Sequence, residues 1–242
     1  MMRVRVRVEP AALVAGDIAI DGDGHHYLAR VRRLGPGDPV VVFDGAGREA
    51  PAVVTAVDAD RVVVRAAAPR PAPAPAPRIV VLQALIKGDR MDWCVEKLVE
   101  VGADRIVLVA AERSVVRLDA ERARSRQRRL QALAEAAARQ CGRADVPPVS
   151  EPLPLAAALA EAAACEARRV CHPSAGEPLA AIAAASVAVL IGPEGGLAPA
   201  ELDAALAAGF APVALGPHTL RAETAGPVAV AGIRLLVAAA EG

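Results

Sequence analysis

The stretch from Val187 to Pro227 contains the residues whose types and spacing best suit ligand chemistry. Gly-Pro-Glu-Gly-Gly occupies 192–196 directly after an apolar run, and Gly-Pro-His occupies 216–218 after a second one. Arg221 and Glu223 follow within a few residues and supply charge of both signs. Glycine tolerates positive φ and lets the backbone approach a ligand closely. Because open α/β sheets bind ligands in loops at the carboxyl ends of their strands, this stretch predicts a ligand site at such an edge.

Alternating strands and helices must position these loops. From Arg78 onwards, short apolar runs alternate with segments of helical character. Asp89 suits the N-cap of the first helix, and Gly102 suits its end. The alternation predicts a parallel α/β sheet with both faces covered. We predict strands at 79–86, 105–110, 168–171, 187–191 and 212–215, helices at 90–101, 119–140, 155–164 and 179–184, a helical segment after residue 196, and a loop at 219–226 that opens the last helix.

The first part of the chain has a different pattern. Arg and Val alternate over residues 3–8, which predicts a half-buried strand with valine inward and arginine on its outer face. That face is either a solvated edge or a row of guanidinium groups for phosphates. Many short strands between Gly- and Asp-rich turns predict a small β-barrel. The other predicted elements are strands at 18–20, 40–43, 52–57 and 61–65 and a helix at 25–34.

A proline-rich segment separates the two patterns. Residues 69–77 read PRPAPAPAP. Alternating proline favours polyproline II and is incompatible with a helix or a central strand. We therefore predict a barrel domain at 1–70, a semi-rigid linker at 71–77 and an α/β domain at 78–242.

Charge is balanced overall but unevenly distributed. Lys and Arg total 28 and Asp and Glu total 28, so no global polyelectrolyte partner is implied. Residues 78–150 carry 14 basic and 10 acidic side chains, whereas residues 151–242 carry 4 and 9. The arginine-rich segment at 119–140 is either a solvated helix face or a face for nucleic acid.

Features missing from the sequence exclude several classes of protein. The four cysteines include no Cys-x-x-Cys pair, so we predict no metal site. The N-terminus has no apolar signal core, and Arg234 interrupts the best apolar run, so we expect no signal peptide and no membrane span. The absence of Gly-x-x-x-x-Gly-Lys-Ser/Thr argues against a P-loop NTPase. We expect a cytoplasmic protein with reduced thiols.

Five segments occur in an order that resembles one family. They read LQALIKGDRMDWCVEKLVEVGADRI, AERSVVR, EAAARQCGRADVPPV, LIGPEGGLAPAE and LGPHTLRAETA. Together they resemble the RsmE family of 16S ribosomal RNA uracil-N3 methyltransferases over residues 78–242, and the N-terminal part looks like that family's PUA-like RNA-binding domain. The resemblance implies the SPOUT fold, in which the C-terminal part of a parallel sheet is threaded into a trefoil knot. It also implies a homodimer that binds S-adenosylmethionine (SAM) in the knot and methylates a uridine in the decoding region of 16S rRNA, within the small ribosomal subunit.

The resemblance assigns cofactor contacts to three knot loops. Small residues, apolar walls and bare backbone suit an adenosine group. The family often has Arg where this chain has His218, and it usually has aromatic residues in the N-terminal strand where this chain has valine. The residues matched to cofactor binding are Leu190, Ile191, Gly192, Pro193, Glu194, Gly195, Gly196, Leu215, Gly216, Pro217, Leu220, Thr224 and Ala225.

Methylation of uracil N3 sets the requirements for catalysis. N3 becomes nucleophilic once its proton leaves, and a nearby cation favours the resulting anion. Arg221 is our candidate for that cation, and Glu223 either accepts the proton or holds Arg221 in place. Alternatively, Glu223 serves only the dipole of the last helix and Thr224 only caps it. The RNA-binding candidates are Arg3, Arg5, Arg7, Arg30, Arg113 and Arg143.

Two other interpretations of this resemblance are open. A different SPOUT enzyme, such as a transfer RNA ribose 2′-O methyltransferase, would share fold and cofactor. A non-catalytic RNA-binding knot protein would keep the fold without binding SAM. In every case, the segment 228–240 is apolar nearly all round, which predicts burial at a subunit interface.

Overall fold

The computed structural model describes residues 4–114 and 119–240 and divides into two compact units. The first unit comprises residues 1–74 and 135–146, and the second comprises residues 75–134 and 147–242. Each unit has a hydrophobic core of its own, as an independent domain requires.

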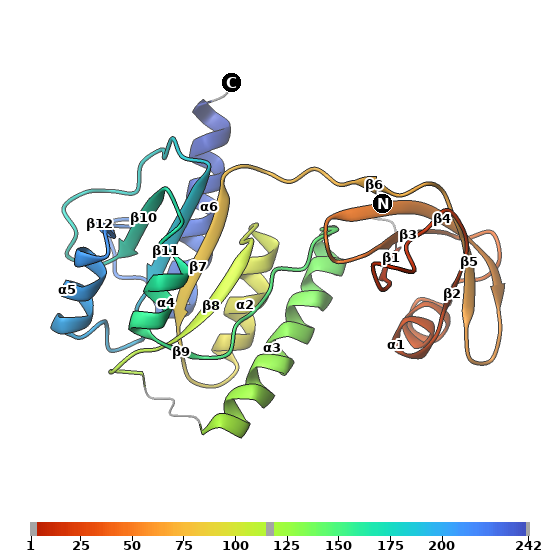
Figure 1. Cartoon of the computed structure of the whole chain (residues 1–242), viewed down its shortest axis with the longest axis horizontal. Helices are drawn as coiled ribbons and strands as arrows, with labels where there is room; N and C mark the ends of the chain where they lie inside the picture. Colours follow the sequence, from red (N-terminus) through yellow and green to blue (C-terminus); the bar gives the residue numbers. More distant parts are fainter. Residues whose placement is uncertain (1–3, 115–118, 241–242) are drawn as a thin grey trace. The chain divides into compact units, whose positions relative to one another are not determined.

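A six-stranded sheet forms most of the first unit (Figure 1). Its strands pair in the order β1-β3-β4-β5-β2, with β6 on β4; β1 and β3 are parallel and the other pairs are antiparallel. Among the described strands, β1 and β2 end this order unpaired with each other, so hydrogen bonds do not close the predicted barrel. The strands are β1 (Val4–Arg7), β2 (Gly16–Ile20), β3 (Pro39–Phe43), β4 (Arg48–Val57), β5 (Val62–Ala66) and β6 (Arg70–Pro71), and the helical elements are α1 (Gly22–His25) and the π-helical η1 (His26–Val31).

Alternating side chains build the core of this unit. Along β4 and β5, buried residues alternate with more exposed ones, which is the period of a strand with one buried face. Val42, Val54 and Val64 point into the same core as Leu28 of η1. The predicted helix at 25–34 therefore contributes one of the most deeply buried side chains of the unit.

Residues 135–146 belong to the first unit although they lie far along the chain. They include the last turns of α3 (Ala120–Cys141). Arg7 Nη1 donates to Glu135 Oε2 at 2.5 Å, and the Arg139 guanidinium lies 4.2 Å from the centroid of the Tyr27 ring. The predicted division of roles between a domain at 1–70 and one at 78–242 stays a prediction.

The second unit is a parallel α/β sheet in the order β12-β10-β11-β7-β8-β9 (Figure 1). In β7, all residues after Arg78 are buried, as expected for a strand covered on both faces. The strands are β7 (Arg78–Ala84), β8 (Arg105–Ala110), β9 (Leu153–Pro154), β10 (Ala167–Cys171), β11 (Ser186–Ile191) and β12 (Ala211–Val213), and the helices besides α3 are α2 (Arg90–Glu100), α4 (Leu155–Glu161), α5 (Pro199–Ala207) and α6 (Ala222–Ala240).

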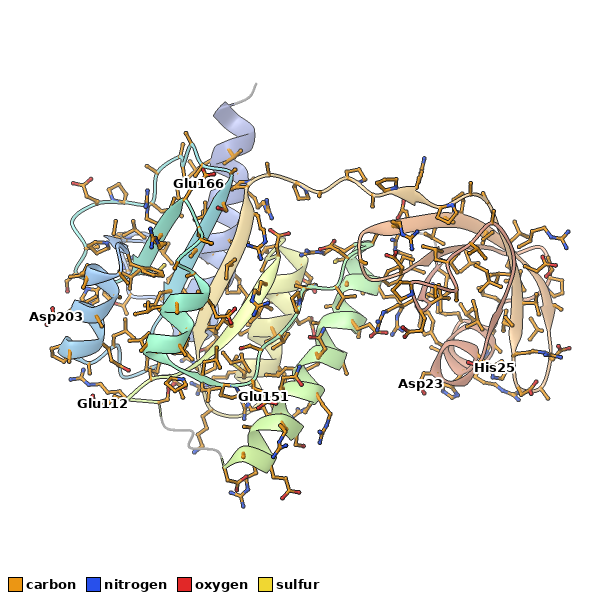
Figure 2. The ribbon with its side chains drawn as sticks, in the orientation of Figure 1. Asp23, His25, Glu112, Glu151, Glu166 and Asp203 are labelled. Carbon is orange, nitrogen blue, oxygen red and sulfur yellow. The ribbon has the colours of Figure 1, made fainter. Side chains whose placement is uncertain are left out.

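Helices cover both faces of this sheet. α2 packs against α6, and α6 packs against β11 and β7, so this pair covers one face. α4 and α5 share a core with Val80, Leu82 and Leu190 on the other face. Figure 2 labels Glu166, just before β10, and Glu112, just after β8, at opposite edges of the sheet. The edge near Glu112 is therefore the carboxyl edge of the strands.

Two predicted elements differ from the structure. The predicted helix at 179–184 is wrong, because this segment forms no helix and its start pairs with residue 214: Leu179 N–H donates to Ala214 O at 2.9 Å, and Ala214 N–H donates to Glu177 O at 2.8 Å. Pairing with the end of β12 satisfies these backbone groups without a helix. The last helix begins at Ala222, inside the predicted loop at 219–226.

Candidate active site

A cavity of about 770 Å³ lies at the carboxyl edge of the parallel sheet. The loops that follow the neighbouring strands β10, β11 and β12 line it, together with the first turn of α6. Arg90 of α2 and Arg113, which follows β8, complete the wall. Carboxyl ends of adjacent parallel strands meet at one edge, so segments far apart in sequence converge here.

The Gly-Pro-Glu-Gly-Gly loop presents bare backbone to this cavity. Gly196 has φ of 71°, in the left-handed region that favours glycine, and its N–H donates to Pro193 O at 2.9 Å. A Cβ added at Gly192 would lie 3.2 Å from the backbone nitrogen of Leu197. Glycine at these two positions therefore keeps the loop tight and its backbone accessible to a ligand.

The start of α6 places a buried carboxylate in the cavity wall. Thr224 N–H and Ala225 N–H both donate to Arg221 O at 2.9 Å and close the first turn. Glu223 thus lies where the helix dipole favours negative charge. It is only 8% exposed, and its Oε2 has no hydrogen-bond partner among the described residues. Because an unpartnered buried oxygen is destabilising, such a group is typical of a functional site.

Arg90 lies between the two carboxylates of the cavity. Its Nη1 is 3.9 Å from Glu194 Oε1, and its Nε is 3.8 Å from Glu223 Oε1. Lys87 N–H also donates to Glu194 Oε1, at 3.3 Å. The beginning of α2 therefore connects the Gly-Pro-Glu-Gly-Gly loop with the beginning of α6.

The remaining polar groups near the cavity include two cysteines that stay protonated. Burial raises the pKa of the Cys171 thiol, at the end of β10, to about 12. Burial, with a smaller contribution from the charge of Glu223, raises the pKa of Cys94 to about 12. Since a thiolate is the reactive form, neither cysteine is suited to nucleophilic chemistry at neutral pH. Arg113 Nη1 donates to Gly195 O at 3.4 Å and reinforces the loop.

Most of the sequence-predicted site residues line this one cavity. Leu190 instead packs in the core with α4 and α5, and Thr224 lies outside the lining. Sequence reasoning missed Arg90, whose helical position gives no loop signal, and Cys171 and His172, which the carboxyl end of β10 could have indicated. The predicted residues in the lining are Ile191, Gly192, Pro193, Glu194, Gly195, Gly196, Leu215, Gly216, Pro217, Leu220, Arg221, Glu223 and Ala225, together with Arg113.

The predicted RNA-binding arginines of the first unit lie in different environments. Arg3 is outside the described residues. The expected outer position of Arg5 is wrong: its side chain is buried and donates to Glu49 Oε2 at 2.8 Å, with the guanidinium 5.2 Å from the Phe43 ring centroid. The ion pair and ring contact compensate the burial of this charge.

The other arginines of that prediction are at or near the surface. Arg30 is exposed, and half-buried Arg7 pairs with Glu135. Arg143 pairs with Asp145, and its carbonyl accepts a hydrogen bond from Arg5 at 3.3 Å. Of these, Arg30 offers the most accessible guanidinium to an anionic partner.

The described residues contain no cluster of three or more His, Cys, Asp or Glu side chains that could hold a metal ion. All four cysteines are free thiols. None of the helices in the described ranges has both the length and the apolar composition needed to span a bilayer.

Comparison with known families gives two matches that together span most of the chain. The family described as an RNA methyltransferase domain matches residues 73–234. The family described as an RNA methyltransferase PUA domain matches residues 20–66. These matches fall on the parallel α/β unit and on the first sheet, so the structure is a mixed α/β protein with a separate PUA-type domain.

Individual relatives agree with these families. Ribosomal RNA small subunit methyltransferase E of Mycobacterium bovis is 38% identical over 90% of this chain and 86% of its own length. The crystal structure of a protein of that name from Neisseria gonorrhoeae, bound to SAM, superposes with a TM-score of 0.88 at 28% identity, covering 97% of this chain and 98% of that one. A methyltransferase of Legionella pneumophila with bound SAM superposes with a TM-score of 0.85 at 28% identity, covering 99% and 98%.

Proposed function

We propose that this chain, which belongs to the ribosomal RNA small subunit methyltransferase E family, transfers a methyl group from SAM to N3 of a uridine in the decoding region of 16S rRNA. The observation that carries the proposal is the cavity at the carboxyl edge of the sheet, in which glycine-rich backbone lies beside the buried carboxylate of Glu223. The glycine-rich backbone provides a surface for a nucleoside cofactor, and the carboxylate of Glu223 provides an acceptor for a proton.

The cavity residues fit SAM by size and by chemistry. A volume of about 770 Å³ is in the range of small-molecule sites. Ile191, Leu197, Val213 and Leu220 supply apolar wall for an adenine ring, and the glycines of the 192–196 loop leave its backbone bare. When bound, SAM supplies a methyl group already activated on a sulfonium, so the chain mainly has to position and deprotonate the uracil.

Glu223 and Arg221 have complementary roles in this proposal. The N3 proton moves to a Glu223 oxygen, and the lone pair left on N3 forms the new bond to the methyl carbon as the bond from carbon to sulfur breaks. Arg221 is exposed at the rim of the cavity, and its guanidinium stabilises the uracil anion by contacting the carbonyl oxygens of the base. Arg90, which lies near Glu223, holds the carboxylate in place.

The finer features of the fold belong to the same proposal. We infer that the loops after β11 and β12 and the start of α6 form the trefoil knot that the family resemblance implies, since all three gather at one cavity. We also infer a homodimer through α6. Leu235 is 71% exposed and Val228 is 38% exposed, and both line a hollow of about 430 Å³ with mainly apolar walls.

SAM binding and methyl transfer test this proposal together. Calorimetry should detect SAM binding to the full chain, and tritiated SAM should label isolated small ribosomal subunits or naked 16S rRNA. The expected setting is the cytoplasm, where these subunits assemble. A chain that binds rRNA but not SAM would support the non-catalytic knot protein instead. Label appearing as 2′-O-methyl nucleoside in transfer RNA would support the other SPOUT enzyme.

A further inference from the structure

The first half of α3 is the most basic continuous segment of the second unit. Residues 119–134 contain five arginines and two acidic residues, an excess of three positive charges in a chain with no net charge. Arg122 and Arg129 are exposed, and they lie seven residues apart, on the same face of the helix. Arg126 is half-buried between them on that face. A cationic row of this kind is suited to phosphate groups.

Direct contacts place this row beside the active-site wall. Arg126 Nη2 donates to Ile86 O at 3.2 Å. The next residue, Lys87, donates its N–H to Glu194 of the cavity at 3.3 Å. Arg129 forms an ion pair with Asp92 of α2, two residues after Arg90 in the cavity wall. The arginine face therefore meets the same β7–α2 segment that borders the cavity.

The acidic partners on this face do not cancel its charge. Asp92 pairs with Arg129, and Asp119 lies 3.5 Å from Arg122, but both arginine side chains are largely exposed. Because both guanidinium groups stay open to solvent, these ion pairs contribute little free energy, and a phosphate can replace the carboxylate at small cost.

Trp93 adds an aromatic surface to the same region. It is the only tryptophan of the chain, and it is 45% exposed, three residues after Arg90 on α2. All four aromatic residues lie in the described ranges: Phe43 and Phe210 are buried, and Tyr27 is half-buried under Arg139. A tryptophan with so much exposed ring is suited to stacking on an unpaired base.

We propose that Arg122, Arg126, Arg129, Lys87 and Trp93 form a track that binds the RNA strand flanking the target nucleotide. The cationic side chains contact phosphates, and Trp93 stacks on a neighbouring unpaired base. The track leads the strand to the cavity, where the target uracil meets Glu223. This inference rests on the proposed function, because it names the surface by which the substrate reaches that site.

Two matched pairs of substitutions in the full-length protein test the track. Arg122→Ala with Arg129→Ala removes two charges from the track. Arg124→Ala with Arg128→Ala removes two from the same helix on a different face, since Arg124 lies two residues from Arg122. Binding of a small-subunit rRNA fragment is measured at several salt concentrations by the fluorescence of Trp93. We expect the first pair to weaken binding about tenfold or more and to reduce the slope of log K against log salt by about 1.4–1.8, and the second pair to have less than half that effect.

Two substitutions of Trp93 test whether this side chain stacks on the RNA. Trp93→Ala should weaken RNA binding about tenfold, and Trp93→Phe should restore part of it, with binding followed on fluorescently labelled RNA. SAM affinity, measured by calorimetry, should be unchanged in all of these variants. Equal effects of the two arginine pairs, or unchanged binding by Trp93→Ala, would overturn the track. If the wild-type protein fails to methylate rRNA at all, the proposed function is at fault instead, whatever the variants do.

Discussion

At the scale of single residues, the proposed chemistry depends most on Glu223. It is buried, lies in the first turn of α6 and has one oxygen without a partner among the described residues. Glu194, the other carboxylate of the lining, is exposed and accepts the N–H of Lys87. The two acids of the cavity therefore differ in environment, and we propose that Glu223 meets the substrate whereas Glu194 holds its loop in place.

We predict that Glu223→Gln lowers kcat for methyl transfer by roughly 10²–10⁴, the usual contribution of a general base. The amide is nearly isosteric but cannot accept the N3 proton, so SAM affinity should stay within about twofold. Single-turnover methyl transfer and calorimetry measure the two effects. Glu194→Gln is the control: it should weaken SAM binding more than it lowers kcat. Full turnover by Glu223→Gln would assign the proton to another acceptor.

Sequence alone indicated the loop residues of the site but not the residues that surround them. Gly192 and Gly196 can be identified from the sequence because glycine directly after an apolar run allows positive φ and close approach of the backbone to a ligand. Arg90 cannot be identified in this way, since an arginine in the first turn of a helix resembles any solvated side chain. The buried position of Arg5 also has no local signal, because strict alternation with valine cannot indicate that Glu49, on β4, pairs with it.

At the scale of elements, Arg234 fastens α6 to the segments around it. Its guanidinium donates to Pro75 O and Pro77 O, and also to Gly102 O and Asp104 Oδ2, at 2.6–2.8 Å. The side chain is only 14% exposed. The residue that interrupts the apolar pattern of the last helix is thus a half-buried clamp.

We predict that Arg234→Met destabilises the second unit by about 3 kcal/mol, because the buried Pro77 and the half-buried Gly102 and Asp104 lose a charged donor. Trp93 lies in this unit and is the single tryptophan, so its fluorescence during urea unfolding reports the change. The matched control is Arg105→Met, which removes a more exposed pair with Glu161 and should cost no more than about 1 kcal/mol. Equal losses in both variants would contradict the clamp.

In the first unit, Asp44 organises the turn between β3 and β4. Its Oδ1 accepts the N–H groups of Ala46 at 2.8 Å and Arg48 at 3.0 Å, and its Oδ2 accepts Arg48 Nε at 2.8 Å. Burial opposes ionisation, but these donors and the Arg48 charge outweigh it and lower the pKa of Asp44 below 3.8. The folded state therefore binds this proton less readily than the unfolded chain does.

The sign of this shift gives a pH prediction. The stabilisation by Asp44 is fully present above about pH 4 and is lost as the pH falls through the lowered pKa. Asp44→Asn should cost the first unit roughly 1–3 kcal/mol at pH 7 and flatten its loss of stability in acid. Circular dichroism during urea unfolding measures this, and the Trp93 transition of the second unit should not move. An unchanged acid dependence would show that Asp44 is not responsible.

Most strands could be predicted, because apolar runs of strand length between turn residues are a local signal. The boundaries of β8 agree with the prediction, and those of β7, β10 and β11 lie within two residues of it. The segment 179–184 is rich in alanine, which favours helices, and alanine content alone therefore predicts a helix there. The backbone bond from Leu179 goes instead to Ala214, which lies more than thirty residues later and gives no local signal.

At the scale of the whole molecule, the exposed apolar face of α6 is suited to burial against another protein surface. Leu235 and Val228 are exposed beside an apolar hollow, and a second copy of the chain is the partner we propose. We predict that Leu235→Glu converts the dimer to a monomer, measured by light scattering across a range of protein concentrations. Arg61→Glu, an exposed change on the first unit, should leave the mass unchanged. A wild-type mass of one chain at all concentrations would contradict the interface.

Identification of the methylated nucleoside distinguishes uracil N3 methylation from the alternative activities. Small ribosomal subunits are incubated with SAM and either the wild-type protein or Glu223→Gln, and the rRNA is then digested to nucleosides and analysed by liquid chromatography and mass spectrometry. We expect N3-methyluridine at one position of 16S rRNA with the wild-type protein and at least a hundredfold slower formation with Glu223→Gln. Methylation on a ribose 2′-oxygen, or equal rates for the two proteins, would contradict it.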